Sequence, residues 1–65
     1  MVEKVVIDFA DFGDFRLEFF FEGQYQVEFI HFGNDSDTLA FTHDRNKAES
    51  VFNACLTVLS TVIDA

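Results

Sequence analysis

Cysteine and histidine are scarce in this chain. Cys55 is the only cysteine among 65 residues, so the chain cannot form an internal disulfide. Together with two histidines, His31 and His43, it offers fewer ligands than a tetrahedral zinc site ordinarily requires. A chain this short buries only about 60% of the surface that its unfolded form exposes. We therefore expect a homodimer or larger oligomer to supply stabilisation that the core alone does not.

Basic residues are also few. Four Lys and Arg residues stand against 12 Asp and Glu, which gives a formal net charge of −8. Between Asp8 and Asp37, eight acids accompany a single base, Arg16. This balance disfavours direct binding to DNA or RNA, including base stacking on the ten phenylalanines, because nucleic acids are negatively charged and the protein surfaces that bind them are positive. It favours a basic protein as partner.

Long apolar runs are absent. No run approaches the roughly 20 residues of a membrane-spanning helix. Met1 is soon followed by Glu3, and no long apolar core of a secretory leader comes after it. The lone Cys55 lies in an apolar helical run, which suits a structural position in a reducing compartment. We expect a cytoplasmic protein without a membrane partner, in the host cytosol if a phage encodes it.

Four short segments have the pattern of β-strands. Alternating or β-branched residues predict strands over Val2–Phe9, Phe15–Glu22, Tyr25–Phe32 and Thr38–Thr42. The connections are too short for parallel crossovers, so the strands should form an antiparallel meander. No proline interrupts the remaining segment, which Thr42 or Asp44 can cap and whose apolar residues recur at helical spacing as far as Ile63. The sequence predicts one α+β domain over residues 1–65, with four strands followed by a C-terminal helix on one face of the sheet.

Alternation also assigns a side of the sheet to each strand residue. The residues predicted to face the helix are Val5, Ile7, Phe9, Phe15, Leu17, Phe19, Phe21, Tyr25, Val27, Phe29, His31, Leu39 and Phe41. For the middle hairpin we favour the register that sets Phe21 opposite Val27. The alternative, with Phe21 opposite Tyr25, sets Glu18 opposite Glu28 and opposes two like charges.

This assignment leaves large apolar residues on the face without a helix. They are Phe20, Ile30 and Phe32, accompanied by Val6 and Ala40 and interleaved with Arg16, Glu18 and Glu28. Clustered apolar groups bordered by charge are typical of interaction surfaces, although the turn around Phe12 is an alternative cover. The predicted partner-binding residues are Glu18, Phe20, Glu28, Ile30 and Phe32, with Asp11, Asp14, Asp35 and Asp37 from the turns.

The helix carries no charged side chain from Ser50 through Ile63. Exposed helices usually carry Glu and Lys on the face away from the core. We therefore predict a homodimer contact through Ala54, Thr57, Val58 and Thr61, with a weakly polar but solvated helix as the alternative.

No catalytic or metal-binding constellation is evident. Neither Ser50 nor Ser60 has a histidine positioned by pattern to activate it. The segment Asn34–Asp37 has oxygen ligands but lacks the later Gly and bidentate Glu of a calcium-binding loop. We expect a protein without enzymatic activity, metal or cofactor.

The leading hypothesis is a small acidic inhibitor or decoy that occupies a basic site on another protein, such as a nucleic-acid-binding enzyme or complex. Phages and mobile elements use small acidic proteins in this way, as anti-CRISPR proteins, anti-restriction proteins and inhibitors of uracil-DNA glycosylase; the likeness is one of size and charge only. Two alternatives stay open. One is a homo-oligomeric assembly module, and the other is a protein that binds a small ligand between subunits through Tyr25, His31 and His43.

Overall fold

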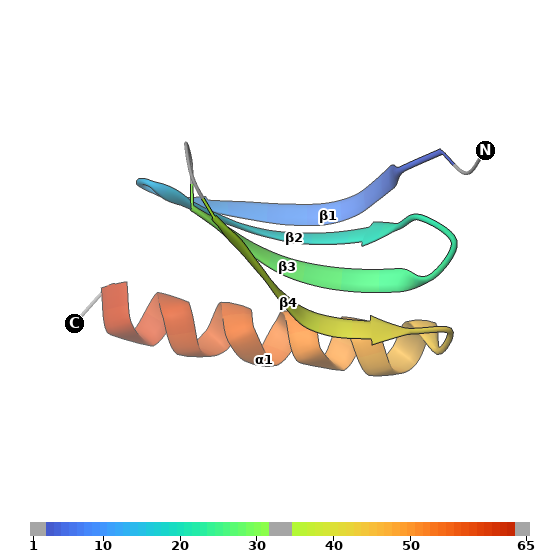
Figure 1. Ribbon diagram of the computed structural model, residues 1–65. Coiled ribbons are helices and arrows are strands. Elements are labelled where there is room, and N and C mark those ends of the chain that lie inside the picture. The colour runs from blue at the N-terminus through green and yellow to red at the C-terminus, as the bar shows by residue number, and fades with distance from the viewer. Residues whose placement is uncertain (1–2, 32–34, 64–65) are drawn as a thin grey trace.

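A computed structural model describes residues 3–31 and 35–63. Its strands are β1 (Val5–Phe12), β2 (Phe15–Phe21), β3 (Tyr25–His31) and β4 (Ser36–Thr42), and its helix is α1 (Arg45–Ile63). The strands form one antiparallel sheet in the order β1-β2-β3-β4, and α1 packs against one face of it (Figure 1). The predicted α+β meander followed by one C-terminal helix is thereby confirmed.

The first two turns are tight, and the ends of the strands differ from those predicted. Only Gly13 and Asp14 separate β1 from β2, so β1 runs to Phe12 rather than ending at Phe9. Gly13 and Gly23 have φ values of 61° and 76°, which a residue with a Cβ adopts only with strain. The two glycines therefore set the positions of the first two turns.

The observed register of the middle hairpin corrects our prediction. Phe21 pairs with Tyr25, which sets Glu18 directly opposite Glu28. The short turn explains this choice, since Gly23 has the positive φ that it needs and the Glu22 amide donates to the Gln24 carbonyl at 2.9 Å. The like-charge pair is tolerated because cations from elsewhere in the fold lie beside Glu18, as shown below.

Two irregularities move phenylalanines to the face that the helix does not cover. The pairing of β1 with β2 shifts between Val6 and Asp8, so Phe9 lies opposite Glu18 rather than on the helix side. The pairing of β3 with β4 shifts in the same way, which sets Phe41 opposite Gln26 and Ala40 opposite the buried Val27. The predicted sides of Phe9, Ala40 and Phe41 were therefore wrong, because strict alternation fails at a bulge.

The core joins the two central strands to the first half of the helix. Its fully buried hydrophobic residues are Leu17, Phe19, Val27, Ala48 and Phe52. The rings of Phe19 and Phe52 lie 5.9 Å apart between centroids, and α1 contacts β2, β3 and β4. Burying side chains of this size contributes about 1.5–3 kcal/mol each. These contacts hold the helix across the sheet.

Asp44 caps the helix. Its Oδ1 atom accepts hydrogen bonds from the amides of Asn46 at 2.9 Å and Lys47 at 3.4 Å. Thr42, the other predicted candidate, instead accepts a hydrogen bond from the Asp44 amide at 3.1 Å.

Among the described residues, no helix has both the length and the apolar character that crossing a membrane demands.

Replacing Phe52 with alanine tests the core. The change should lower the free energy of unfolding by about 3–5 kcal/mol, because it leaves a cavity beside Phe19. A domain of this size has roughly 3–10 kcal/mol in total, so Phe52→Ala should remove a large part of its stability. Urea denaturation followed by circular dichroism measures the effect. The control Val62→Ala alters an exposed residue of the same helix and should cost less than about 0.5 kcal/mol. Equal costs for both variants would contradict this packing.

Candidate functional site

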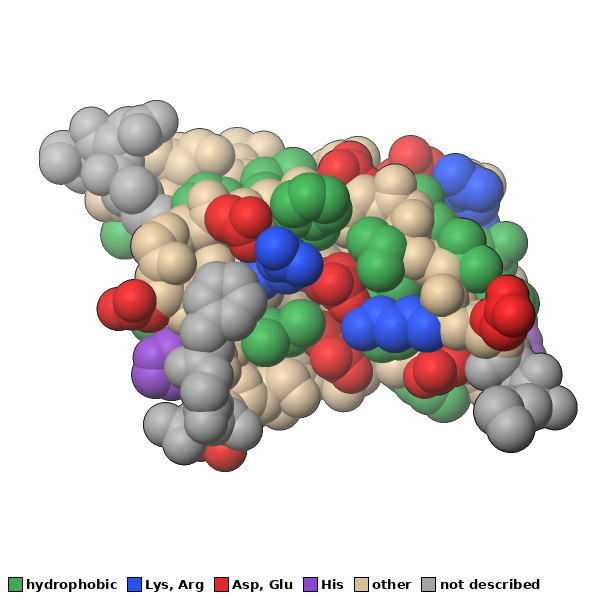
Figure 2. All heavy atoms as spheres, turned by 90° about the horizontal axis from the view of Figure 1, so that it is seen from above, with side chains coloured by type: hydrophobic (Ala, Val, Ile, Leu, Met, Phe, Trp, Pro, Cys, Tyr) green, Lys and Arg blue, Asp and Glu red, His purple; other side chains and the backbone are tan. Residues whose placement is uncertain are grey.

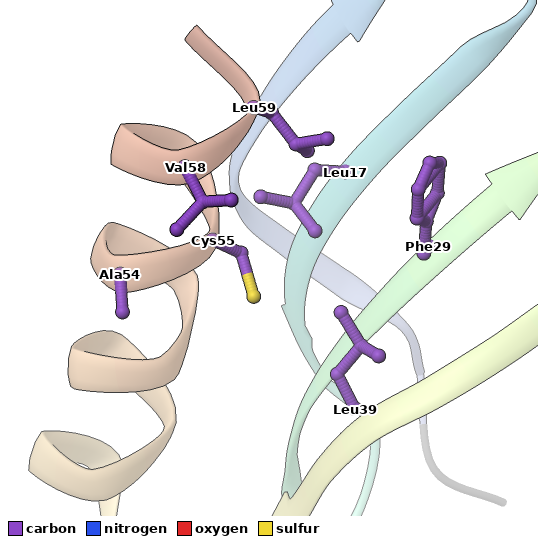
Figure 3. A pocket seen from close by; sticks show the side chains of 7 residues that line it. All are labelled: Leu17, Phe29, Leu39, Ala54, Cys55, Val58 and Leu59. Atoms are coloured by element: carbon purple, nitrogen blue, oxygen red, sulfur yellow. The ribbon is translucent and has the colours of Figure 1, made fainter. Parts of the chain in front are cut away.

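An apolar groove lies between the second half of α1 and the sheet (Figure 3). Its lining residues are Leu17, Phe29 and Leu39 from the strands and Ala54, Cys55, Val58 and Leu59 from the helix. The groove exists because the helix is buried along its first half, at Ala48 and Phe52, whereas Val58 and Val62 further along are exposed. Its volume is about 270 Å³. That is just below the range of sites for small molecules, so it suits one or two side chains of another protein.

A second hollow adjoins this groove, and Phe29 lines both. Its other lining residues are Phe15, His31, Asp35 and Asp37, and its volume is about 230 Å³. The Phe15 ring stacks on His31 with centroids 4.9 Å apart and meets Phe29 edge-on at 5.0 Å. The apolar groove therefore leads into an aromatic hollow with two carboxylates at its rim.

We call Asp14, Asp35 and Asp37 the acidic end of the molecule. Asp14 lies in the β1–β2 turn, and Asp35 and Asp37 lie at the start of β4, which is the same end of the sheet. All three are exposed, and no cation of the described chain forms a salt bridge with them. The C-terminal end of α1 points to this end as well (Figure 1). Because that end of a helix has a partial negative charge, it adds to the field of the three carboxylates.

The helix-free face of the sheet has a different electrostatic character. Lys4 Nζ lies 2.6 Å from Glu18 Oε1, and Arg16 Nη1 lies 3.8 Å from Glu18 Oε2. Arg16 also binds both carboxylate oxygens of Asp11, at 2.7 and 3.3 Å, and this hydrogen bonding raises the pKa of Arg16 above its ordinary value. Figure 2 shows acidic and basic side chains intermixed with hydrophobic ones over this face. Lys4 and Arg16 therefore neutralise Glu18 and Asp11 within the chain, whereas Glu28 has no salt-bridge partner among the described residues.

Lys4 also changes the role of Phe20. Its ammonium group lies 4.4 Å from the centroid of the Phe20 ring. Phe20 is only 3% exposed and Glu18 only 4% exposed. Our expectation that Phe20 needs a partner to cover it is thus wrong, because the chain covers it with its own N-terminal segment. Nor does Glu18 offer a free charge to a partner.

Other apolar residues are exposed on this face instead. Val6, Phe9 and Phe41 are 46%, 50% and 60% exposed, respectively. Ile30 is half-buried, and Phe32 lies outside the described residues. The bulges that turned Phe9 and Phe41 outward leave no signal in the alternation, so sequence reasoning did not identify these two residues.

The structure divides the predicted dimer contact on the helix. All four residues are exposed, but Ala54 and Val58 line the groove and Thr57 and Thr61 do not. The hydroxyls of Thr57 and Thr61 donate to the carbonyls of Asn53 and Thr57, at 3.0 and 2.9 Å. The apolar part of the predicted contact thus borders the groove, and the dimer contact itself stays a prediction.

Little in the described chain supports metal or small-ligand chemistry. No group of three or more His, Cys, Asp or Glu residues among those described is arranged to hold a metal ion. Tyr25 and His31 stand at opposite ends of β3, so they do not converge on one ligand within a single copy. Comparisons with protein-family models, curated proteins and solved structures found no match to the chain.

A double-mutant cycle on Lys4 and Glu18 tests the ion pair. Lys4→Met keeps an apolar stem beside Phe20 but removes the cation, and Glu18→Gln removes the carboxylate. Lys4→Met should cost about 1–3 kcal/mol of unfolding free energy, because it leaves a buried carboxylate with only the longer Arg16 contact. In the Glu18→Gln background the same change should cost at least ~1 kcal/mol less. Additive effects in urea denaturation would show that the pair is not coupled.

Proposed function

We propose that this protein is a small non-enzymatic inhibitor or decoy that binds a basic site on another protein. One observation supports this most directly: two exposed carboxylates without cation partners in the described chain, Asp35 and Asp37, line the hollow that adjoins an apolar groove, and Asp14 lies at the same end of the sheet. An acidic turn that is merely solvated would not require an apolar groove beside it. A purely apolar dimer contact would not require exposed carboxylates at its edge. The combination suits a partner segment with both basic and apolar side chains.

The two parts of the site have different tasks. The carboxylates of Asp14, Asp35 and Asp37 attract a basic partner from a distance and speed its association. An apolar side chain of that partner enters the groove between Leu39 and Val58 and slows dissociation, because buried anchors dominate binding energy. Glu28 of the helix-free face, half-buried and directly opposite Glu18, is not part of this site.

The proposed partner is a nucleic-acid-binding enzyme or complex, because a surface that binds phosphates is itself strongly basic. Duplex DNA has one charge for about every 1.7 Å of its axis, a density that three carboxylates at one end of a sheet do not reproduce. The chain therefore acts by blocking a basic site with an anchored acidic end, not as a replica of a duplex. Its size and net charge of −8 suit an anti-defence protein of a phage or mobile element that acts in the cytoplasm.

Affinity capture identifies the partner. Immobilised wild-type chain is exposed to cell lysate at low and high salt, and the retained proteins are identified by mass spectrometry. We expect one basic protein that is lost at high salt, because the exposed charges are then screened. Recovery of this chain alone would support the assembly module instead.

The double variant Asp35→Asn with Asp37→Asn tests the acidic end. At about 50 mM salt it should associate with the captured protein at least ~3-fold more slowly, because the attractive field at the hollow is weakened. The matched control is Glu22→Gln with Glu49→Gln, which changes the net charge equally at exposed positions away from that hollow. Stopped-flow or surface plasmon resonance measures both. Equal slowing by the two double variants would show that only total charge matters.

Val58→Glu tests the groove. A carboxylate placed there should weaken binding to the captured protein by at least ~100-fold, mainly through faster dissociation, because it would be buried without a partner. Val58 is exposed in the free chain, so the fold should be retained, as circular dichroism can verify. Thr57→Glu is the control, since it adds the same charge one residue away at a position that does not line the groove. Undiminished binding by Val58→Glu would exclude the groove from the interface.

A further inference from the structure

The helix-free face carries exposed apolar residues that the helix does not cover, and it is distinct from the groove. Val6 and Phe9 on β1 and Phe41 on β4 are each about half exposed, and α1 lies on the other side of the sheet. The already covered Phe20 lies between Val6 and Phe41 in one row across the sheet, and the half-buried Ile30 lies beyond Phe9, beside Arg16. These apolar residues lie on one face among Gln26, Glu18 and Glu28, and together they exceed the single exposed apolar residues of an ordinary surface.

The charge of this face is nearly balanced, although the chain as a whole is strongly acidic. Lys4 and Arg16 lie there with Asp11, Glu18 and Glu28, which leaves one net negative charge out of the −8 of the chain. Two of the three carboxylates are already paired at 2.6 and 2.7 Å within the face. Glu18 is also already removed from water, so covering it again has little additional desolvation cost.

We propose that a second copy of this chain covers this face, so that two sheets stack with their helices on the outside. A basic partner is attracted to acidic surface, whereas this face offers it little net charge. Two copies that each have a net charge of −8 repel one another least where their charges are neutralised. Antiparallel sheets commonly bury such faces against each other about 10 Å apart.

The area of the helix-free face determines how strong we expect dimerisation to be. A seven-residue strand is about 23 Å long and four adjacent strands span about 19 Å, so each copy contributes roughly 440 Å² of flat sheet. Both copies together reach about 900 Å², which is below the ~1,000 Å² of a specific stable interface and within the range of weak, transient contacts. We therefore expect a reversible dimer whose population depends on concentration, not a permanent one.

Glu28 distinguishes a second copy from a foreign basic partner. It lies opposite Glu18, is half-buried, and forms no salt bridge with any cation in the described part of the chain. In a dimer, two such carboxylates are brought into one interface, so Glu28→Gln should strengthen self-association. On a face that binds a basic protein, the same change should weaken binding, because it removes an attractive charge.

Sedimentation velocity of the purified chain from about 5 µM to 1 mM tests the proposal. We expect a concentration-dependent monomer–dimer equilibrium. Phe41→Asp should raise its dissociation constant at least ~10-fold, because it places a like charge from each copy in an apolar contact. Glu28→Gln, which leaves the apolar face intact, should lower the constant by ~2-fold or more.

Val58→Glu is the control, since it adds the same charge on the groove side and should leave the dimer constant within about 2-fold. A monomer at all concentrations would overturn the proposal, as would a dimer that Val58→Glu but not Phe41→Asp dissociates, or one that Glu28→Gln weakens. The outcome is independent of the proposed function: Phe41→Asp should still bind the captured basic protein, and Val58→Glu should still dimerise.

Discussion

One helix covers one face of a sheet that is apolar on both faces, and the other features of this molecule follow from that constraint. The helix is buried at Ala48 and Phe52 but stands away from the sheet further along, which leaves the groove between Leu39 and Val58. On the opposite face the chain uses the stem of Lys4 and its ammonium group to cover Phe20. A long cationic side chain can do this because its apolar stem packs while its charged end stays partly solvated.

Lys4 also affects which surfaces of the protein keep unpaired negative charge. Lys4 and Arg16 neutralise Glu18 and Asp11 on the helix-free face, so the acidity of that face is largely cancelled. The remaining cations, Arg45 and Lys47, lie in the first turn of α1, whose C-terminal end points to the acidic end of the sheet. The charge distribution is therefore directional, although the composition suggests a uniformly acidic molecule.

This separation of surfaces accommodates two kinds of contact on a chain of 65 residues. The groove and its acidic end have the character of a site for a basic partner with an apolar anchor. The helix-free face, apolar and nearly neutral, has the character of a contact between copies. If both proposals hold, a dimer would present two acidic ends, and the avidity of paired sites would raise the affinity for a partner with two basic sites.

The sequence by itself was sufficient for the fold class. Alternation in Phe15–Phe21 and Tyr25–His31, the glycines at 13 and 23, and helical spacing after Asp44 are local signals, and local signals carry secondary structure and short connections. The absence of charge from the second half of the helix is also visible in the sequence, but the groove beside that half is not.

Tertiary structure alone decided which side chains are exposed. The bulges near Ile7 and Leu39 depend on pairing with a neighbouring strand, and they moved Phe9 and Phe41 to the helix-free face. The contact of Lys4 with Glu18 and Phe20 joins residues that are far apart in the chain, so no local pattern announces it. Burial and charge pairing are properties of contacts across the fold, and for that reason the binding surfaces became visible only once the strands were paired.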